Sequence, residues 1–260
     1  MKSQQIEELN VKFYDKLYKK KYPLIALLHS IVSYDQQSKS KRNYFYLQDS
    51  INSYQQRNRK IRYLDYGCGH GSLLLKMNSN MELYASDISI NTLKNLSDIT
   101  RLLKREINTI TVDEFLVDNF ERKFDIISCS HVLEHVENDK ELLTVFNKNL
   151  ASGGILLLNL PFNEVRLDPK HVHKYDIIKA KNMLNKSGFV IKEIIQSDRL
   201  TGWIMLSENS MSWASLKKII FRVIRLLFGL IPLSILFLLD RMLPKKIPFQ
   251  QLIIIAEKND

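Results

Sequence analysis

Glycines and an acidic residue gather in the stretch LDYGCGHGS, residues 64–72. A short apolar run leads into Asp65, and glycines then occupy alternating positions: Gly67, Gly69 and Gly71. Because glycine lacks a Cβ, such a turn accepts positive φ angles and lets the backbone approach a ligand closely. Residues 72–76 have helix-forming composition, and a helix that starts there would offer free N–H groups. The stretch therefore predicts a nucleotide-type cofactor site where a strand passes into a helix.

Two further apolar runs also end in acidic residues. The run 82–86 ends at Asp87, where a carboxylate can accept hydrogen bonds from both ribose hydroxyls of such a cofactor. The run 107–112 ends at Asp113, which we expect to accept a hydrogen bond from an adenine amino group. A single Asp after a strand is usually a turn residue or a helix N-cap, but three in succession point to one site. Their neighbours complete the predicted cofactor pocket: Cys68, Ile88, Glu114, Phe115 (against the adenine ring) and Ser130.

Histidines form the second group of reactive side chains. His131 follows the apolar run 124–130, and an imidazole with an unperturbed pKa of about 6.5 can take a proton from a hydroxyl group. The alternative is that His131 lines a pocket and makes one hydrogen bond. His171 and His173 alternate in a segment that we expect to be extended, so both would face the substrate side. Capping or packing of that loop is the alternative role for this pair.

Glu134 and His135 follow His131 closely, which raises the question of a metal ion. Their spacing differs from the H-E-x-x-H pattern, in which two histidines on one helix face bind zinc. We therefore expect no metal, and we expect these two residues to fix the loop from the helix that follows the strand.

The elements that must position these groups follow from the pattern of apolar residues. From residue 61 onward, apolar runs alternate with helical segments bounded by polar residues or glycine. Such alternation predicts an α/β fold with a doubly wound, mostly parallel sheet and helices on both faces. The runs expected to form its seven strands are 61–66, 82–86, 107–112, 124–130, 154–160, 189–195 and 251–256.

Residues 1–60 predict a helical cap in front of this sheet. Apolar residues recur at helical spacing over 4–19. A second apolar stretch covers 24–32, and 44–54 has the composition of a further helix. The polar segment 33–42 separates these last two.

The acidic and glycine pattern resembles that of a known family. The motif D-x-G-x-G-x-G, followed by Asp87 and Asp113, is similar to that of class I S-adenosylmethionine-dependent methyltransferases, and the resemblance covers about residues 60–200 and 250–258. The strand followed by LEHV, residues 133–136, is similar to the small-molecule branch that includes quinone and natural-product methyltransferases. The resemblance implies a Rossmann-like sheet, S-adenosyl-L-methionine as cofactor, Asp65 at its amino group, and His131 close to its methyl group.

Composition narrows the partners and the compartment. The chain has 260 residues, a formal net charge of +10 and two cysteines, Cys68 and Cys129. Two thiols in a chain of this size fit a reducing compartment, and the acidic N-terminal stretch MKSQQIEELN has no apolar core, so we expect a cytoplasmic protein without a signal peptide. The positive charge fits nucleic acid, an anionic membrane or simple solubility. Since no dense basic and aromatic stripe accompanies it outside residues 201–249, we expect no nucleic acid partner.

Residues 201–249 depart from the family pattern, as an insertion between the two parts of the cofactor-binding domain, 61–200 and 250–260. Lys218, Arg222 and Arg225 form a cationic helix stripe, and an uncharged stretch with Pro232 inside follows it. That stretch is shorter than the roughly 20 apolar residues that a spanning helix needs. We expect residues 213–248 to form a bent helical pair at the inner face of a membrane. A lid or a dimer interface is the alternative.

Together these features predict O-methylation of a small or lipid-linked acceptor near a membrane. Two alternatives remain open at this point: an RNA or protein methyltransferase, which the net charge would suit, and a catalytically silent, membrane-attached scaffold that only binds the cofactor. The acceptor and the oligomeric state do not follow from the residues.

Overall fold

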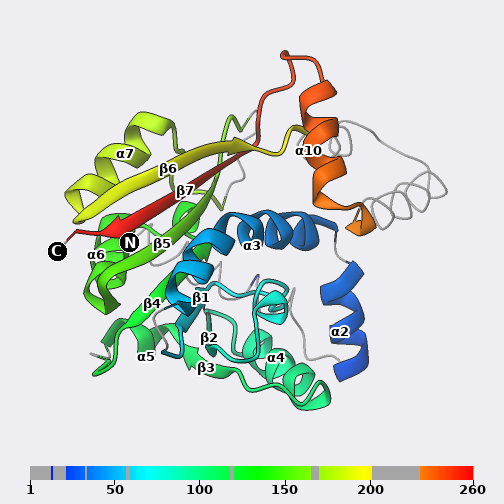
Figure 1. Cartoon of the computed structure of the whole chain (residues 1–260), viewed down its shortest axis with the longest axis vertical. Helices are drawn as coiled ribbons and strands as arrows, with labels where there is room; N and C mark the ends of the chain where they lie inside the picture. The colour runs from blue at the N-terminus through cyan, green and yellow to red at the C-terminus, as the bar shows by residue number, and fades with distance from the viewer. Residues whose placement is uncertain are drawn as a thin grey trace.

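The chain folds around one seven-stranded sheet with the strand order β3-β2-β1-β4-β5-β7-β6 (Figure 1). The computed structural model describes residues 13, 22–32, 34–56, 59–117, 120–164, 170–200 and 229–259. The strands are β1 (Arg62–Tyr66), β2 (Glu82–Asp87), β3 (Asn108–Thr111), β4 (Phe124–Ser130), β5 (Leu150–Pro161), β6 (Phe189–Ser197) and β7 (Gln251–Lys258). All neighbours pair in parallel except β7, which runs antiparallel to both β5 and β6. The predicted mostly parallel α/β sheet is confirmed.

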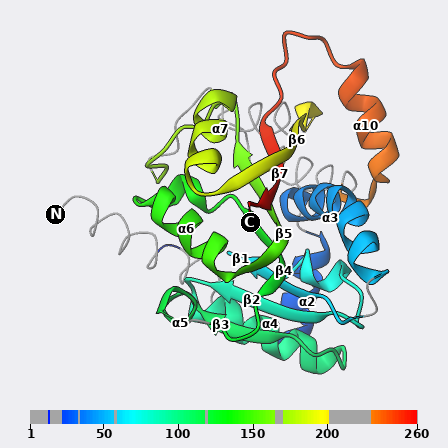
Figure 2. The same ribbon diagram turned by 60° about the vertical axis from the view of Figure 1, so that its left-hand side comes forward.

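Helices cover both faces of the sheet, so the sheet is doubly wound (Figure 2). One apolar core joins the sheet to α5 (Val112–Val117), α6 (Asp139–Asn149) and α7 (Ile177–Lys186). The opposite core joins it to α3 (Tyr34–Gln55) and α4 (Ile90–Leu102). Every residue of β1 is buried, as expected for a central parallel strand covered on both faces. The Asp176 side chain caps α7 by accepting from the Lys179 N–H at 2.7 Å.

The N-terminal part differs from the prediction in one respect. The expected apolar helix is α2 (Pro23–Val32), and the expected helix over 44–54 is the second half of α3. The polar segment over 34–42 is not a separator, because it forms the first half of α3. Polar side chains face inward there: the Gln37 amide donates to the Ser30 carbonyl at 2.6 Å, and Arg42 is fully buried. Residues 4–19, apart from Phe13, lie outside the described residues.

The prediction of a helix directly after the glycine turn is wrong. The structure has only a single 3-10 turn there, η1 (Leu74–Lys76). The connection is short, because β2 already begins at Glu82. Arg105 also donates to the carbonyls of Leu75 and Met77, at 2.6 and 2.7 Å, and these are carbonyls that a longer helix would have used itself. A second 3-10 turn, η2 (Leu133–His135), likewise replaces the helix that we expected to start after β4.

The insertion is described from residue 229 onward. Helix α10 (Leu233–Met242) begins directly after Pro232, where the sequence predicts a break between two helices. The cationic stripe of the insertion falls in 201–228, outside the described residues. Among the residues that the structure describes, no helix is both long enough and apolar enough to cross a membrane.

Candidate active site

The glycine turn connects β1 to η1 and lies at the carboxyl ends of β1 and β2. All three glycines have positive φ, at 75° for Gly67, 51° for Gly69 and 72° for Gly71. The N–H groups of Gly67 and Cys68 donate to the Ser86 carbonyl at 2.8 and 3.0 Å, which fixes the turn against the end of β2. Since L side chains rarely adopt such angles, the turn requires glycine for its backbone alone.

Two of these glycines also leave no room for a side chain. A Cβ on Gly67 would stand 2.1 Å from Val132 Cγ2, and one on Gly71 would stand 2.4 Å from Leu96 Cδ1. Val132 follows the end of β4, so the backbone of the glycine turn packs against a side chain of the loop after β4. Packing therefore disfavours a side chain at these two positions, and the close approach of the turn to a ligand stays a prediction.

Asp87 lies at the end of β2 and ties the turn to the next helix. Its carboxylate accepts hydrogen bonds from the Gly69 N–H and the Ser89 N–H, both at 2.9 Å. A carboxylate has about four lone-pair sites, so these two contacts leave acceptor capacity for ribose hydroxyls. Ile88 follows it, half-buried, and Ser89 caps α4. The residues present at this edge thus fit the nucleoside part of the cofactor.

Asp65 lies at the end of β1 and is buried. The Ser128 hydroxyl donates to its Oδ1 at 2.6 Å, and the Tyr63 hydroxyl lies 2.6 Å from Ser128 Oγ. Burial raises the pKa of Asp65 to about 7; the Ser128 hydrogen bond opposes this shift and the charge of Asp87 adds to it. Within the described part of the chain, no lysine or arginine forms an ion pair with Asp65. An ammonium group of a ligand would supply the missing cation, which fits the amino group of the cofactor's methionine part.

The residues predicted to contact the adenine group differ in their exposure to solvent. Asp113 and Glu114 are exposed in the first turn of α5, and the Glu114 carboxylate accepts from the Thr111 N–H at 2.7 Å, which lowers the pKa of Glu114. Phe115 has no exposed surface and packs against Tyr66 and Phe146 in the core. Asp113 is therefore exposed after β3, whereas Phe115 is a core residue, and a contact of either with the cofactor stays a prediction.

His131 lies directly after β4, beside Ser130, and has a left-handed backbone with a φ of 55°. Its N–H donates to the Asn159 carbonyl at 2.8 Å, and its ring Nδ1 lies 3.1 Å from Glu134 Oε1. The ring Nε2 has no hydrogen-bond partner among the described residues. A proton on Nδ1 shared with Glu134 leaves the Nε2 lone pair available, which is the arrangement that a general base requires.

Glu134 is fully buried on η2. Burial acts to raise the pKa of this carboxyl, but the hydrogen bond and charge of His131, together with the charge of His135, bring the pKa below its ordinary value. The carboxylate is therefore ionised around neutral pH. It holds the His131 ring in one orientation through the contact at Nδ1.

A second histidine pair lies next to this carboxylate. His135 and His171 pack edge to face with ring centroids 4.8 Å apart, and His171 Nδ1 lies 2.7 Å from Glu164 Oε1. The ligand atoms of Glu134, His135 and His171 lie within 4.8 Å of one another, so this set could hold a metal ion. Sequence spacing missed the cluster because His171 arrives from a separate loop. The expectation that the protein uses no metal stays a prediction.

His173 contacts other groups than His171 does. Its Nε2–H donates to the Glu137 carbonyl at 2.9 Å, and Asp139 Oδ2 lies 3.7 Å away. Tyr175 reinforces this loop by donating to Asp139 at 3.0 Å. The structure thus brings His131 and Glu134 together directly and His171 beside them, whereas His173 anchors its loop to the start of α6.

Sequence reasoning missed a set of buried polar residues at the same edge. Asn159, which interrupts the apolar run of β5, donates to Asn43 Oδ1 at 2.9 Å and to Gln251 Oε1 at 3.0 Å. Because the Asn159 carbonyl also holds His131, this network connects the cap helix α3 to the β4 loop. A lone Asn in an otherwise apolar strand is a detectable signal, since a buried amide needs partners.

Comparison with known proteins agrees with this geometry. A family model for a methyltransferase domain matches residues 39–209. A ubiquinone biosynthesis O-methyltransferase of Histophilus somni (strain 2336) is 27% identical over 178 residues, which cover 57% of this chain and 73% of that protein. A magnesium protoporphyrin IX methyltransferase from Synechocystis PCC 6803, solved with SAH bound, superposes with a TM-score of 0.55 at 14% identity, covering 89% of this chain and 87% of that one. A phosphoethanolamine N-methyltransferase from Haemonchus contortus, solved with S-adenosyl-L-methionine, gives 0.54 at 16% identity, covering 77% and 49%. Since the family model spans more than half of the chain, this protein belongs to the class I S-adenosylmethionine-dependent methyltransferases.

Proposed function

We propose that this enzyme methylates a hydroxyl oxygen of a small or lipid-linked acceptor. The observation that carries the proposal is the His131–Glu134 pair, with its buried carboxylate on Nδ1 at 3.1 Å and a buried Nε2 that has no hydrogen-bond partner among the described residues. A hydroxyl acceptor loses a proton when it is methylated, and a positioned imidazole can receive it. The name of the Histophilus relative, an O-methyltransferase, supports the same atom type.

The chain's residues divide the work between holding the cofactor and preparing the acceptor. Asp65, the glycine turn and Asp87 would hold S-adenosylmethionine, which supplies a methyl group on a sulfonium. Transfer then requires that the acceptor oxygen stand in line with this methyl group, and positioning of that kind accounts for a large part of the rate. In this proposal His131 removes the hydroxyl proton, and Glu134 is its positioning residue.

We further propose that the reaction takes place at the cytoplasmic face of a membrane. The uncharged stretch after Arg225, with basic residues on both sides of it, is suited to lie in the interface of an anionic leaflet. Acceptors of the quinone type or lipid-linked glycans would be reached from such a position. A soluble hydroxylated acceptor would need no such contact.

The test follows labelled methyl groups from the cofactor into fractions of a host extract. The expected result is label in a lipid or small-molecule fraction, with the labelled methyl group on an oxygen atom of the product. Label in RNA or protein would contradict the proposal. H131A should reduce turnover by about 10²–10⁴-fold while calorimetry still detects cofactor binding. Near-normal turnover of H131A would remove the base from the mechanism. Cofactor binding with no labelled product in any fraction would favour a silent scaffold.

A further inference from the structure

Helix α2 leaves apolar side chains in solvent. The helix, PLIALLHSIV, contains no acidic or basic residue apart from one histidine. Its leucines and isoleucines at four positions are 46–61% exposed: Leu24, Ile25, Leu28 and Ile31. Exposed apolar residues scattered singly need no explanation, but several on one short helix form a contiguous patch that asks for a partner.

Helix α10, from a distant part of the chain, shows the same feature. Side chains on this helix and just before it are 46–72% exposed: Leu230, Ile235, Leu238 and Met242. Its acidic residue, Asp240, is buried and accepts a hydrogen bond from Arg42 at 3.0 Å. The surface of α10 is therefore free of negative charge.

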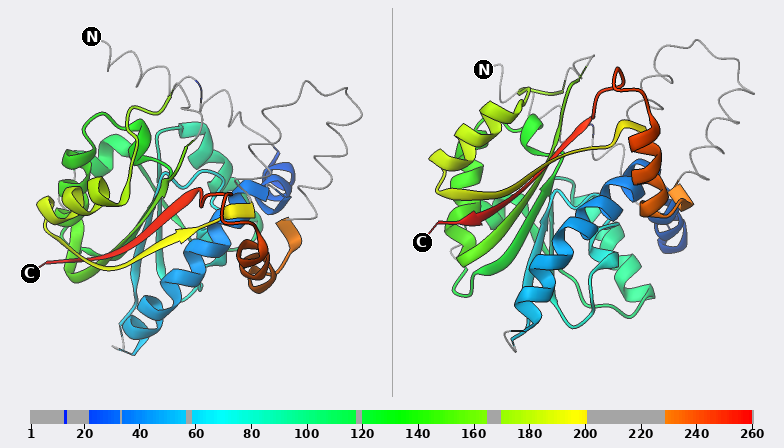
Figure 3. Two further views of the ribbon diagram at one scale, coloured as in Figure 1. Left: turned by 90° about the horizontal axis from the view of Figure 1, so that it is seen from above. Right: turned by 45° about the horizontal axis from the view of Figure 1, so that its top comes forward.

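Both helices are attached to α3, which fixes them on one side of the sheet (Figure 1, Figure 3). The Lys41 ammonium on α3 donates to the carbonyls of Gly229 and Ile231, at 2.7 and 3.1 Å, directly before α10. Phe45, half-exposed on α3, packs against Phe237 of α10 with ring centroids 5.4 Å apart. Both helices with exposed apolar side chains thus lie against α3, and these side chains are here together named the α2/α10 surface.

The α2/α10 surface borders the cofactor edge of the sheet. The Ser72 hydroxyl, next to the glycine turn, donates to the Ser30 carbonyl of α2 at 3.0 Å. On the other side, Asp240 accepts from the Arg199 and Leu200 N–H groups, which follow the carboxyl end of β6. A partner seated on this surface would lie against the edge at which methyl transfer takes place.

Charge identifies the partner. Three consecutive lysines, residues 19–21, directly precede the start of α2 in the sequence. Arg241, Lys245 and Lys246 are exposed at the end of α10 and just after it. Two apolar helices whose single acid, Asp240, is buried, with exposed cations at the end of α10, match an anionic lipid surface. A second copy of the chain would bring the same cations together across a two-fold axis, which disfavours a dimer at this surface.

We propose that the α2/α10 surface docks onto an anionic lipid bilayer, with α2 and α10 lying in the interface. The inference deepens the proposed function, because it names the surface through which a lipid-linked acceptor would reach the active edge. It does not depend on the chemistry of transfer, since docking requires neither cofactor nor acceptor.

The test is flotation of the full chain with vesicles of phosphatidylcholine containing about one third phosphatidylglycerol, and with phosphatidylcholine alone. The wild type should float with the anionic vesicles and largely remain behind with the neutral ones. The double variant L28Q/L238Q should lower binding about tenfold or more, because it removes one exposed leucine from each helix. K245E/K246E should weaken binding to the anionic vesicles alone.

Matched controls carry the same substitution at exposed apolar positions elsewhere, V117Q on α5 and I178Q on α7. Both should float like the wild type. A wild type that stays at the bottom with anionic vesicles would overturn the proposal, and so would L28Q/L238Q floating as well as the controls. A concentration-dependent dimer that L28Q/L238Q abolishes would assign the surface to a second copy instead. Loss of methyl transfer to every acceptor, with flotation intact, would count against the proposed function and not against the docking.

Discussion

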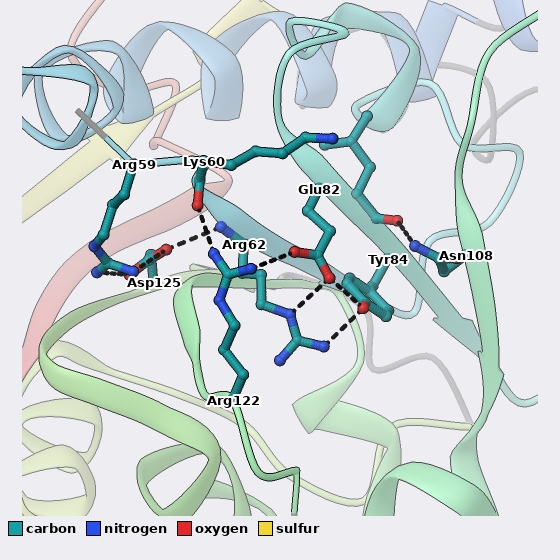
Figure 4. A network of polar contacts seen from close by, with 9 residues as sticks. Arg59, Lys60, Arg62, Glu82, Tyr84, Asn108, Arg122 and Asp125 are labelled. Atoms are coloured by element: carbon teal, nitrogen blue, oxygen red, sulfur yellow. Dashed lines mark hydrogen bonds and ion pairs between the residues drawn. The ribbon is translucent and has the colours of Figure 1, made fainter. Parts of the chain in front are cut away.

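Two charge networks lie at opposite ends of the sheet, and they are built in different ways. At the amino ends of the strands, Arg62 of β1 donates to Glu82 of β2 at 3.0 Å, and its own N–H donates to Asp125 of β4 at 2.9 Å (Figure 4). Arg122 adds a second cation to Glu82, and Arg59 supplies the cation that pairs with Asp125, both from half-exposed positions. This network is redundant and partly hydrated, and it joins strands that already pair with one another.

The network at the carboxyl end is buried, and Arg42 is the cation that contacts its carboxylates within the described part of the chain. Arg42 of α3 donates to Ser197 Oγ at 2.8 Å and to Asp240 at 3.0 Å, and it lies 3.6 Å from Asp198. All of these side chains are buried. Its members come from the cap, the sheet and the insertion. The comparison indicates that the amino-end charges reinforce the sheet, whereas the carboxyl-end charges attach the parts around the active edge.

The largest effect is expected from R42M. It keeps much of the side-chain volume but leaves Asp198 and Asp240 buried without their cation, which costs about 3–5 kcal/mol of unfolding free energy. Urea denaturation followed by circular dichroism measures it. A loss below about 1 kcal/mol would mean that the buried carboxylates find other compensation and that the two networks do not differ as argued.

Asp65 extends the comparison, because it is a buried carboxylate at the active edge for which the described chain supplies no cation. Its pKa of about 7 lies above the ordinary value of 3.8, so this group's contribution to stability is complete below pH 3.8 and is lost as pH rises through 7. Binding of a cationic ligand has the opposite sign, since it requires the ionised form. The cofactor affinity should therefore rise with pH up to about 7 and then level off, changing by about tenfold per pH unit below that point.

Calorimetric titration of S-adenosylmethionine between about pH 5.5 and 8.5 measures this dependence. D65N should bind weakly at every pH and lose the slope. An unchanged slope in D65N would assign the pH dependence to another group, and strong binding by D65N would remove Asp65 from the cofactor site.

A smaller effect is expected from D125A at the amino end. The substitution leaves the buried Arg62 N–H without its acceptor, whereas the half-exposed Arg59 can turn to water. The expected loss is about 1–3 kcal/mol of unfolding free energy, measured by the same urea titration. A loss larger than that of R42M would reverse the order of the two networks.

The strands were predictable because each apolar run is local and its period is visible in the sequence. Strand β5 is the instructive exception: it begins at Leu150 and not near 154, since Leu150 pairs with Phe124 across a bulge while Gly153 and Gly154 resemble a turn. The glycine turn and Asp87 were predictable for the same local reason. Whether Asp87 contacts a cofactor stays a prediction.

Contacts between distant segments were not predictable from one sequence. Arg42 and Asp240 are 198 residues apart, and the sequence around each of them does not indicate that it has a buried partner. For this reason the sequence predicts a polar separator over 33–42, although Gln37 there bonds to α2 and Arg42 bonds to the end of β6. His135 and His171 come together only because the loop that carries His171 folds back onto η2, and the spacing of histidines in the sequence does not predict this. Tertiary packing therefore determines which of these distant residues meet around the active edge.

The smallest effect is expected from R122M, which serves as the control for the whole comparison. Arg122 donates to Glu82 at 2.9 Å, but it is half-exposed, and Arg62 keeps Glu82 paired after the substitution. The unfolding free energy should change by less than about 1 kcal/mol, and less still in high salt, because exposed ion pairs are screened. Burial acts to raise the pKa of Glu82, but hydrogen bonds from Tyr84 and Arg62 and the charges of Arg62 and Arg122 lower it overall. The Glu82 contribution is thus present above its unfolded pKa and is lost in acid, so any difference between R122M and the wild type should disappear there. A difference that grows in acid or in high salt would show that the amino-end network is not the hydrated, redundant one described above.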